Sequence, residues 1–223
     1  MEPRIGALVV GQSPRLEVDE EFQRLAKGSA QLVLKGALDG FSRDELELFQ
    51  PVDNKDALFT RLPSGEGISL SKKQVISNGA DKLNELKMSG VDVVIMLCTG
   101  TFPEWQDFKG VLFPSNTLSS MVKGCLQTGK ICVFSPLQRQ CAACQLRWEE
   151  NGYDVVSLSL LPNATKEEAV LAGQAAGRHD LDLIILDCIS YTNETKKVIR
   201  ETAGVPVILG LSSAIRTALE MVE

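Results

Sequence analysis

Two cysteines at matching places in a repeated stretch are the residues of this sequence best suited to chemistry. Residues 90–99 read GVDVVIMLCT and residues 180–189 read DLDLIILDCI. Aligned on Cys98 and Cys188, the two stretches share an aspartate and an unbroken apolar run. A free thiol has a pKa of about 8.5, so cysteine can serve as acid or base near neutral pH. One cysteine on each face of a substrate carbon could therefore remove a proton and return one from the opposite side.

The segments around the cysteines predict a buried parallel strand that ends at each thiol. Val93–Met96 and Leu183–Leu186 are short apolar runs, each preceded by a helical pattern and followed by turn residues. In open parallel sheets, ligands bind at the carboxyl edge, where the following helix presents free N–H groups. Helix N-termini just after Cys98 and Cys188 would also favour the thiolate. If the two halves of the chain face one another, both thiols reach a single cleft.

The rest of the chain alternates predicted strands and helices, which favours the α/β class with mainly parallel sheets. A first strand is predicted at Ile5–Val10, a hairpin within Leu58–Leu70 and a last helix at Ser212–Val222. Capping-box spacing predicts helix starts at Ser42 and Thr165. Two cycles of similar order indicate a duplicated half.

Polar residues after these strands could bind a substrate carboxylate, because developing negative charge needs preorganised donors. The candidates offer backbone N–H groups, hydroxyls or an amide. They are Ser13, Thr99, Gly100, Thr101, Ser135, Gln138, Tyr191 and Thr192. Arg15 and Arg61 could each clamp a carboxylate with a planar guanidinium group.

Composition narrows the classes of function. The chain has 223 residues, 44% of them hydrophobic, and a formal charge of −6. This charge argues against a nucleic-acid or anionic-membrane surface as partner. The sequence shows no leader pattern and no apolar window long enough to span a bilayer, so we expect a cytoplasmic protein with reduced cysteines. The oligomeric state stays open, with a homodimer as one option.

A second cysteine pair, Cys141 and Cys144, has the spacing of a redox dithiol or half of a zinc site. No second pair or nearby histidine completes a metal site, and the motif is predicted to lie inside a helix, whereas a thioredoxin-like helix begins at its first cysteine. We therefore favour a structural role for the pair, and core positions for Cys125 and Cys132. No nucleotide-binding fingerprint is present, so no cofactor and no metal are expected.

Several short strings carry a family resemblance. They are Gly11-Gln12-Ser13-Pro14-Arg15, Gly36-Ala37-Leu38-Asp39-Gly40, Thr60-Arg61-Leu62, Leu97-Cys98-Thr99-Gly100-Thr101-Phe102, Pro136-Leu137-Gln138, and Leu186-Asp187-Cys188 followed by Tyr191-Thr192. With them, the chain resembles the AroM-type branch of the aspartate/glutamate racemase superfamily. The resemblance implies two pseudo-symmetric α/β lobes, the first formed by residues 1–115 with 205–223 and the second by residues 116–204. It implies no established reaction for the AroM-type branch.

Three hypotheses of function follow. The leading one is a cofactor-independent racemase or isomerase that acts on a small carboxylate, with Cys98 and Cys188 as acid and base. The second is a metabolite-binding or regulatory protein without turnover, and the third is an isomerase with one covalent cysteine, as in maleate isomerase-like relatives. The second is motivated by Ser190, which stands where racemases of this superfamily typically have a histidine. The single histidine, His179, precedes the strand, and Asp187 is predicted to turn to the face opposite the thiol.

Overall fold

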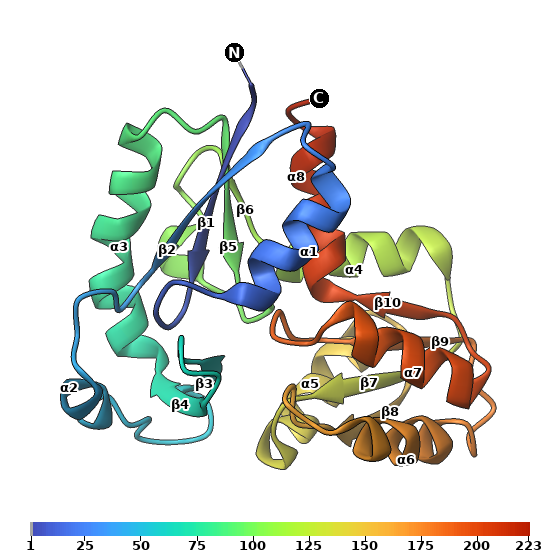
Figure 1. Cartoon of the computed structure of the whole chain (residues 1–223). Coiled ribbons are helices and arrows are strands. Elements are labelled where there is room, and N and C mark those ends of the chain that lie inside the picture. Colours follow the sequence, from blue (N-terminus) through green and yellow to red (C-terminus); the bar gives the residue numbers. More distant parts are fainter. Residues whose placement is uncertain (1) are drawn as a thin grey trace. The chain divides into compact units, whose positions relative to one another are not determined.

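The computed structural model describes residues 2–223, and the chain forms two compact units. The first comprises the residues up to Ser115 together with Ala214–Glu223, and the second comprises Asn116–Ser213. The chain leaves the first unit within helix α4 (Pro114–Cys125) and returns within helix α8 (Gly210–Glu220), as can be followed in Figure 1. Within residues 2–223, no helix combines the length and apolarity needed to cross a membrane.

The first unit is built on a four-stranded parallel sheet of order β2-β1-β5-β6. Its strands are β1 (Arg4–Val9), β2 (Gln31–Gly36), β5 (Val93–Leu97) and β6 (Val111–Leu112). The two inner strands, β1 and β5, are almost entirely buried, which explains why both read as unbroken apolar runs. They end in register, with the last residue of β1 paired to the last residue of β5.

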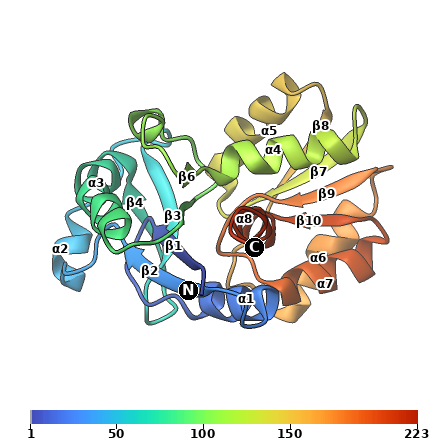
Figure 2. The same cartoon turned by 90° about the horizontal axis from the view of Figure 1, so that it is seen from above.

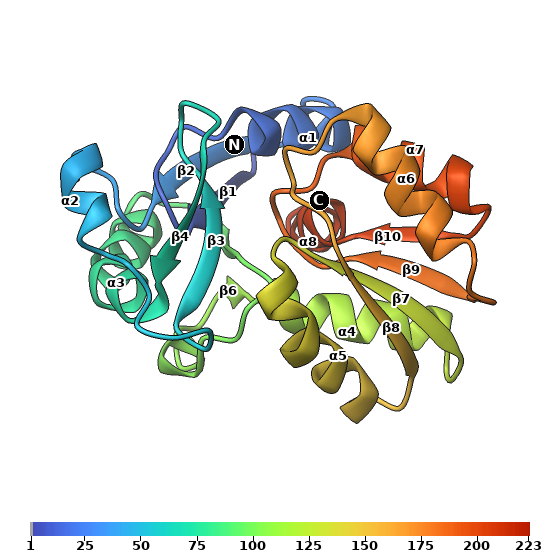
Figure 3. The ribbon, with the colours of Figure 1, turned by 90° about the horizontal axis from the view of Figure 1, so that it is seen from below.

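The first unit also contains helices and a hairpin. They are α1 (Leu16–Ala26), α2 (Arg43–Glu47), α3 (Lys72–Met88), the 3-10 helix η1 (Pro103–Trp105), and the antiparallel hairpin of β3 (Ala57–Arg61) and β4 (Gly67–Ser71). Figure 3 shows the hairpin beside α3. The hairpin agrees with the strand pair predicted within residues 58–70, since Leu58 lies opposite Leu70.

The second unit repeats the arrangement with a parallel sheet of order β10-β9-β7-β8. Its strands are β7 (Lys130–Ser135), β8 (Asp154–Ser159), β9 (Leu183–Leu186) and β10 (Val207–Leu209), and its further helices are the 3-10 helix η2 (Gln138–Gln140), α5 (Cys141–Glu150), α6 (Lys166–Ala176) and α7 (Asn193–Ala203). Figure 2 shows α6 and α7 on one face of this sheet and α4 and α5 on the other. Strands β1, β2, β5 and β6 thus correspond in order to β7, β8, β9 and β10. The predicted α/β class with mainly parallel sheets is confirmed.

The structure differs from the sequence-based division at residues 205–213, which were expected to return to the first lobe. Strand β10 pairs with β9 in the second sheet, with Val207 opposite Ile184 and Leu209 opposite Leu186. The edge of a buried strand needs a partner for its backbone groups, and β10 supplies that partner to β9. Only Ala214–Glu223 therefore belongs to the first unit.

Local caps explain where two helices begin. Ser42 and Thr165 each accept a hydrogen bond from the backbone N–H three residues later, and the glutamate at that position bonds back to the cap. Both predicted capping boxes are therefore confirmed. Helix α2 ends at Glu47, because the N–H groups of Leu48 and Phe49 bond to carbonyl groups only three residues back. This tighter turn ends the helix before Pro51 is reached.

Candidate functional site

Cys98 follows β5 directly at the carboxyl edge of the first sheet. Its backbone N–H bonds to the carbonyl oxygen of Met96 at 2.7 Å, which turns the chain sharply out of the strand. Its Sγ atom is half-buried and accepts the backbone N–H of Gly100 at 3.4 Å. A donor aimed at sulfur favours the thiolate over the thiol. The Gly100 N–H in this loop therefore stabilises the thiolate form of Cys98.

Cys188 lies at the corresponding edge of the second sheet. The N–H of Asp187 bonds to the carbonyl oxygen of Phe134 and continues the ladder, and Cys188 is the next residue. Its Sγ atom accepts the backbone N–H of Ser190 at 3.4 Å, and the residue is 9% exposed. Both cysteines therefore follow an inner strand, and in both the sulfur accepts the N–H two residues later.

The segment after Cys98 corrects one expectation. A helix N-terminus was predicted there, but the structure has only the 3-10 helix η1, and the next α-helix begins at Pro114. The reason is that Phe102 and Trp105 are both buried in the core and stack with ring centroids 5.1 Å apart. This anchors the chain in a short turn. After Cys188 the helix is present: α7 begins at Asn193, capped by the Thr192 side chain.

The loop that contains Thr99, Gly100 and Thr101 lies beside the Cys98 thiol and two apolar side chains. Thr99 is buried and Thr101 is exposed. A methyl group built on Gly100 would lie 3.4 Å from the Cys98 sulfur, 3.6 Å from Leu58 and 3.8 Å from Phe102. Gly100 is thus the place where the backbone donor, the thiol and an apolar wall meet.

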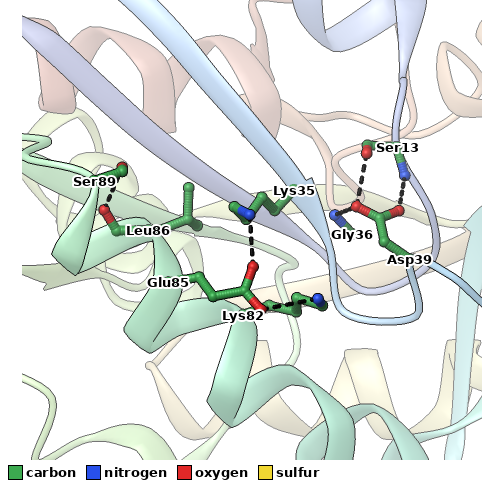
Figure 4. Close-up of polar contacts among 8 residues, drawn as sticks. All are labelled: Ser13, Lys35, Gly36, Asp39, Lys82, Glu85, Leu86 and Ser89. Atoms are coloured by element: carbon green, nitrogen blue, oxygen red, sulfur yellow. Dashed lines mark hydrogen bonds and ion pairs between the residues drawn. The ribbon is translucent and has the colours of Figure 1, made fainter.

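Ser13 is engaged by a residue that the sequence did not single out as functional. Its N–H donates to Asp39 Oδ1 and its hydroxyl to Asp39 Oδ2, both at 2.7 Å, while the Gly36 N–H donates to Oδ2 at 2.7 Å (Figure 4). A side chain at Gly36 would meet the Gln12 Cα and the Gly11 carbonyl oxygen at 2.5 Å. In the structure, Asp39 therefore uses the two donors that were predicted to bind an anion. The signal that could have found it is the glycine-flanked turn 36–40.

Arg15, a predicted carboxylate clamp, has protein partners for its guanidinium group. It is 3% exposed, donates from Nε to Glu17 at 2.8 Å, and donates from Nη1 to the Thr60 hydroxyl at 3.0 Å. These bonds tie the start of α1 to the β3–β4 hairpin. In this structure, Arg15 therefore stabilises the packing of α1 against the hairpin.

Arg61, the other predicted clamp, lies at the end of β3. Leu58 and Thr60 of the same strand approach Gly100 and Gly11, so strand alternation places Arg61 on the opposite face of the hairpin. Its Nε atom is buried and has no hydrogen-bond partner within residues 2–223. Arg61 thus has a donor available for a ligand.

The predicted binding residues of the second unit divide into buried and accessible ones. Ser135 is buried and donates to the Cys144 sulfur. Tyr191 is fully buried, donates its hydroxyl to the Leu160 carbonyl oxygen at 2.6 Å, and burial raises its pKa well above the usual value. Gln138 is exposed and accepts the Ser159 hydroxyl, and Thr192 is half-buried. Gln138 and Thr192 are therefore the more accessible members of this set.

The Cys141-x-x-Cys144 pair does lie at a helix start, contrary to the sequence-based expectation. Helix α5 begins at Cys141, directly after η2. Burial, followed by the negative charge of Asp187, nevertheless raises the pKa of the Cys144 thiol to about 12. Burial likewise raises the pKa of Cys132 to about 12. Both thiols are protonated at neutral pH and are poor nucleophiles.

All six cysteines are free thiols. Cys132 is buried as predicted, but Cys125 is exposed, because it is the last residue of α4. Among the described side chains, no cluster of three or more histidine, cysteine, aspartate or glutamate residues could hold a metal ion.

Asp187 forms a buried polar cluster that sequence reasoning missed. Its Oδ2 atom accepts the Trp148 Nε1–H at 2.8 Å and the Cys144 thiol at 3.4 Å, and it forms an ion pair with Arg147. The carboxylate is therefore directed at α5, in keeping with the face that strand alternation predicted. The partners lie about 40 positions away in sequence, so no local pattern reveals them.

Comparisons with known proteins agree with this arrangement. The chain is similar to arylmalonate decarboxylase (16% identity, 98% of this chain and 92% of that chain covered, TM-score 0.64). It is also similar to glutamate racemase from Aquifex pyrophilus (17% identity, 99% and 84% covered, TM-score 0.58). A third similar structure is a cysteine-to-serine mutant of maleate cis-trans isomerase from Nocardia farcinica with a covalently bound succinylcysteine intermediate (14% identity, 98% and 92% covered, TM-score 0.64). A search of curated proteins found no match.

These structures share the fold of the aspartate/glutamate racemase superfamily. The family model described as "AroM protein" matches residues 5–222, which is nearly the whole chain. The chain therefore belongs to the AroM family.

Proposed function

We propose that this protein is a cofactor-independent racemase or isomerase that acts on a small carboxylate, with Cys98 and Cys188 as its acid and base. The observation that carries the proposal is the matched environment of the two sulfurs. Each follows an inner parallel strand, and each accepts a backbone N–H from two residues later at 3.4 Å. Structural cysteines need no such donor, whereas a thiol that must ionise near neutral pH benefits from one.

The reaction would exchange protons between the two cysteines and the substrate. The thiolate of one cysteine removes the proton from the carbon next to the carboxylate and becomes a thiol. The thiol of the other cysteine gives its proton to the opposite face of that carbon and becomes a thiolate. The protons balance without a cofactor, and the next turnover runs in the reverse sense. The proposal requires that both sulfurs reach opposite faces of one substrate.

Binding of the carboxylate would rest on donors beside the sulfurs. Thr99 and Thr101 follow Cys98 closely in sequence and carry N–H groups and hydroxyls. Thr192 caps the helix after Cys188, and the Nε–H group of Arg61 has no hydrogen-bond partner among residues 2–223. Glutamate racemase and maleate isomerase, which share the fold, are named for carboxylate substrates, which supports this choice of ligand. The apolar wall of Leu58 and Phe102 favours a substrate whose remaining part is small and uncharged on that side.

Hydrogen exchange in heavy water tests the proposal. Amino acids, hydroxy acids, unsaturated diacids and malonates are incubated with the protein in heavy water, and NMR follows deuterium at the carbon next to the carboxylate. We expect exchange with at least one class, reduced by at least about 100-fold in Cys98→Ser and in Cys188→Ser, since a general acid or base contributes about that factor. Exchange that persists at the wild-type rate in both variants contradicts the assignment. Ligand-dependent stabilisation without exchange would favour the metabolite-binding hypothesis.

A second candidate function is isomerisation through one covalent cysteine. The succinylcysteine intermediate in the structurally similar maleate isomerase motivates it, together with the greater exposure of Cys98 compared with Cys188. Intact-protein mass spectrometry after an acid quench tests it. A substrate adduct on Cys98 that also forms in Cys188→Ala supports covalent attack, whereas turnover without any adduct supports proton transfer.

A further inference from the structure

We infer that Arg147 and Asp187 form a charge pair that sets the ionisation of Cys188. The inference rests on the catalytic role proposed for Cys188 and adds a positioning function for two residues outside the thiol loops. Asp187 precedes Cys188 directly, and Arg147 belongs to helix α5.

The Asp187 carboxylate is buried and held in place by Arg147 and Trp148. The Asp187 side chain is 1% exposed, whereas the Arg147 side chain is 30% exposed. The carboxylate is held by the Trp148 indole N–H at 2.8 Å and by the ion pair with Arg147, and the Asp187 backbone is held in the β9–β7 ladder. Because the backbone and the side chain are both fixed, the direction in which Cys188 leaves the strand is fixed as well.

The charges explain why Arg147 is needed. A buried carboxylate one residue before a thiol opposes formation of the thiolate, because like charges repel strongly where water is excluded. The positive guanidinium group of Arg147 forms an ion pair with the same Asp187 oxygen that accepts the Trp148 N–H. The pair then carries almost no net charge, so the repulsion between the carboxylate and a thiolate at Cys188 is offset.

Two titratable groups beside the Arg147–Asp187 pair carry no charge at neutral pH. Tyr191 lies close to Cys188 and Asp187, and its phenol pKa is raised by burial. Cys144 faces Asp187 from α5, and its thiol pKa is about 12. Ser135 contributes an uncharged hydroxyl from β7. Arg147 and Asp187 thus supply the charge in this set of neighbours.

Cys98 has a different setting. The residue before it is Leu97, which is buried and apolar, whereas the residue before Cys188 is Asp187. The two cysteines therefore share the N–H contact but differ in the residue that precedes them. This difference makes Cys98 an internal control for Cys188 within the same protein.

Variants that remove the charge of Arg147, of Asp187 or of both test the inference. The pKa of each thiol is read from the ¹³Cβ chemical shift of cysteine-labelled protein during a pH titration, with signals assigned from Cys98→Ser and Cys188→Ser. We expect Arg147→Gln to raise the pKa of Cys188 by about one unit and Asp187→Asn to lower it by a similar amount, as removal of a nearby charge does. The double variant returns it to within a few tenths of the wild-type value. The pKa of Cys98 stays constant in all three variants.

The sign pattern separates electrostatics from damage to the fold. A purely structural role moves the pKa of Cys188 in the same direction in both single variants, and the double variant does not restore it. Either of those results, or an equal shift of Cys98, overturns the inference. Arg147→Lys retains the charge and is expected to titrate like the wild type, so it keeps the test valid should Arg147→Gln fold poorly. The titration requires no substrate, so it is independent of the proposed function. If the variants shift the pKa of Cys188 as expected but the protein shows no exchange activity, only the proposed function is refuted. If exchange depends on Cys188 but the pKa shifts are absent, only this inference is refuted.

Discussion

The backbone N–H of Gly100 lies 3.4 Å from the Sγ atom of Cys98 and donates to it. The same contact recurs between Ser190 and Cys188 at the same distance, although the two loops have different sequences. The shared geometry comes from the position of each cysteine at the end of an inner parallel strand, where the chain must turn out of the sheet.

Removing this donor is expected to weaken the Cys98 thiolate. Gly100→Pro has no N–H, so we expect the pKa of Cys98 to rise by about one unit, the lower range for a hydrogen bond to a charged group. Gly100→Ala keeps the N–H and is the matched control, with its methyl group in ordinary contact with the sulfur at 3.4 Å. A ¹³Cβ titration of Cys98 measures both. Equal pKa values in the two variants contradict a role for the donor.

The two arginines near the β3–β4 hairpin are expected to separate binding from stability. Arg61→Gln should raise the KM of a carboxylate substrate about 10-fold or more while the free energy of unfolding stays within about 0.5 kcal/mol, because a charge-assisted bond is lost in the complex only. Arg15→Gln should instead lower the free energy of unfolding by about 3 kcal/mol, because Arg15 is buried against Glu17 and Thr60. Steady-state kinetics and urea unfolding measure the two effects. A KM that responds to Arg15→Gln and not to Arg61→Gln would reverse the assignment.

Glycine at position 36 is expected to be indispensable for the first unit. Gly36→Ala would place a methyl group 2.5 Å from backbone atoms of Gly11 and Gln12, so we expect a loss of at least about 3 kcal/mol in the free energy of unfolding. Gly124→Ala is the control, since its methyl group meets nothing within 4 Å in helix α4, and a small gain of about 0.5 kcal/mol is expected. Urea unfolding distinguishes them, and similar values for both variants would contradict the close packing at Gly36.

The buried thiols predict a loss of stability at alkaline pH. The folded-state pKa of Cys132 and Cys144 is about 12, above the value of about 8.5 to 9 that a thiol has in the unfolded chain. The contribution of each thiol to the free energy of unfolding is therefore fully present below pH 9. It is lost as pH rises toward 12, by about 1.4 kcal/mol per pH unit for each thiol. Cys132→Val and Cys144→Ala should each flatten the fall in unfolding free energy measured between pH 9 and pH 11. An unchanged slope in both variants would show that these thiols ionise freely in the folded protein.

A short thiol cross-linker tests the geometry that the proposed reaction requires. Dibromobimane, which becomes fluorescent when it joins two thiols, is expected to link Cys98 to Cys188 within one chain. The variants Cys98→Ser and Cys188→Ser are the controls and should each abolish the product, which peptide mass spectrometry identifies. Modification of both cysteines without any link between them would contradict a shared substrate site.

Much of the fold could be predicted because its signals are local. Apolar runs at Val93–Leu97 and Leu183–Leu186 are long enough to mark buried strands, and two capping boxes mark helix starts within four residues. The repeat of an apolar run followed by cysteine placed both thiols at strand ends before any contact was known. Each of these features depends only on neighbouring residues, so the sequence by itself determined the class of fold and the location of both thiols within their sheets.

Tertiary structure decided which side chains are free for a ligand and which are already used. Ser13 meets Asp39, Arg15 meets Thr60, and Asp187 meets Trp148 only after folding, across 26, 45 and 39 positions of sequence. It also decided that β10 pairs with β9, and that Phe102 and Trp105 replace the expected helix after Cys98 with a short turn. The physical reason is the same in each case: a buried charge, donor or aromatic ring takes the partner that packing brings within reach, and the spacing along the chain does not reveal that partner.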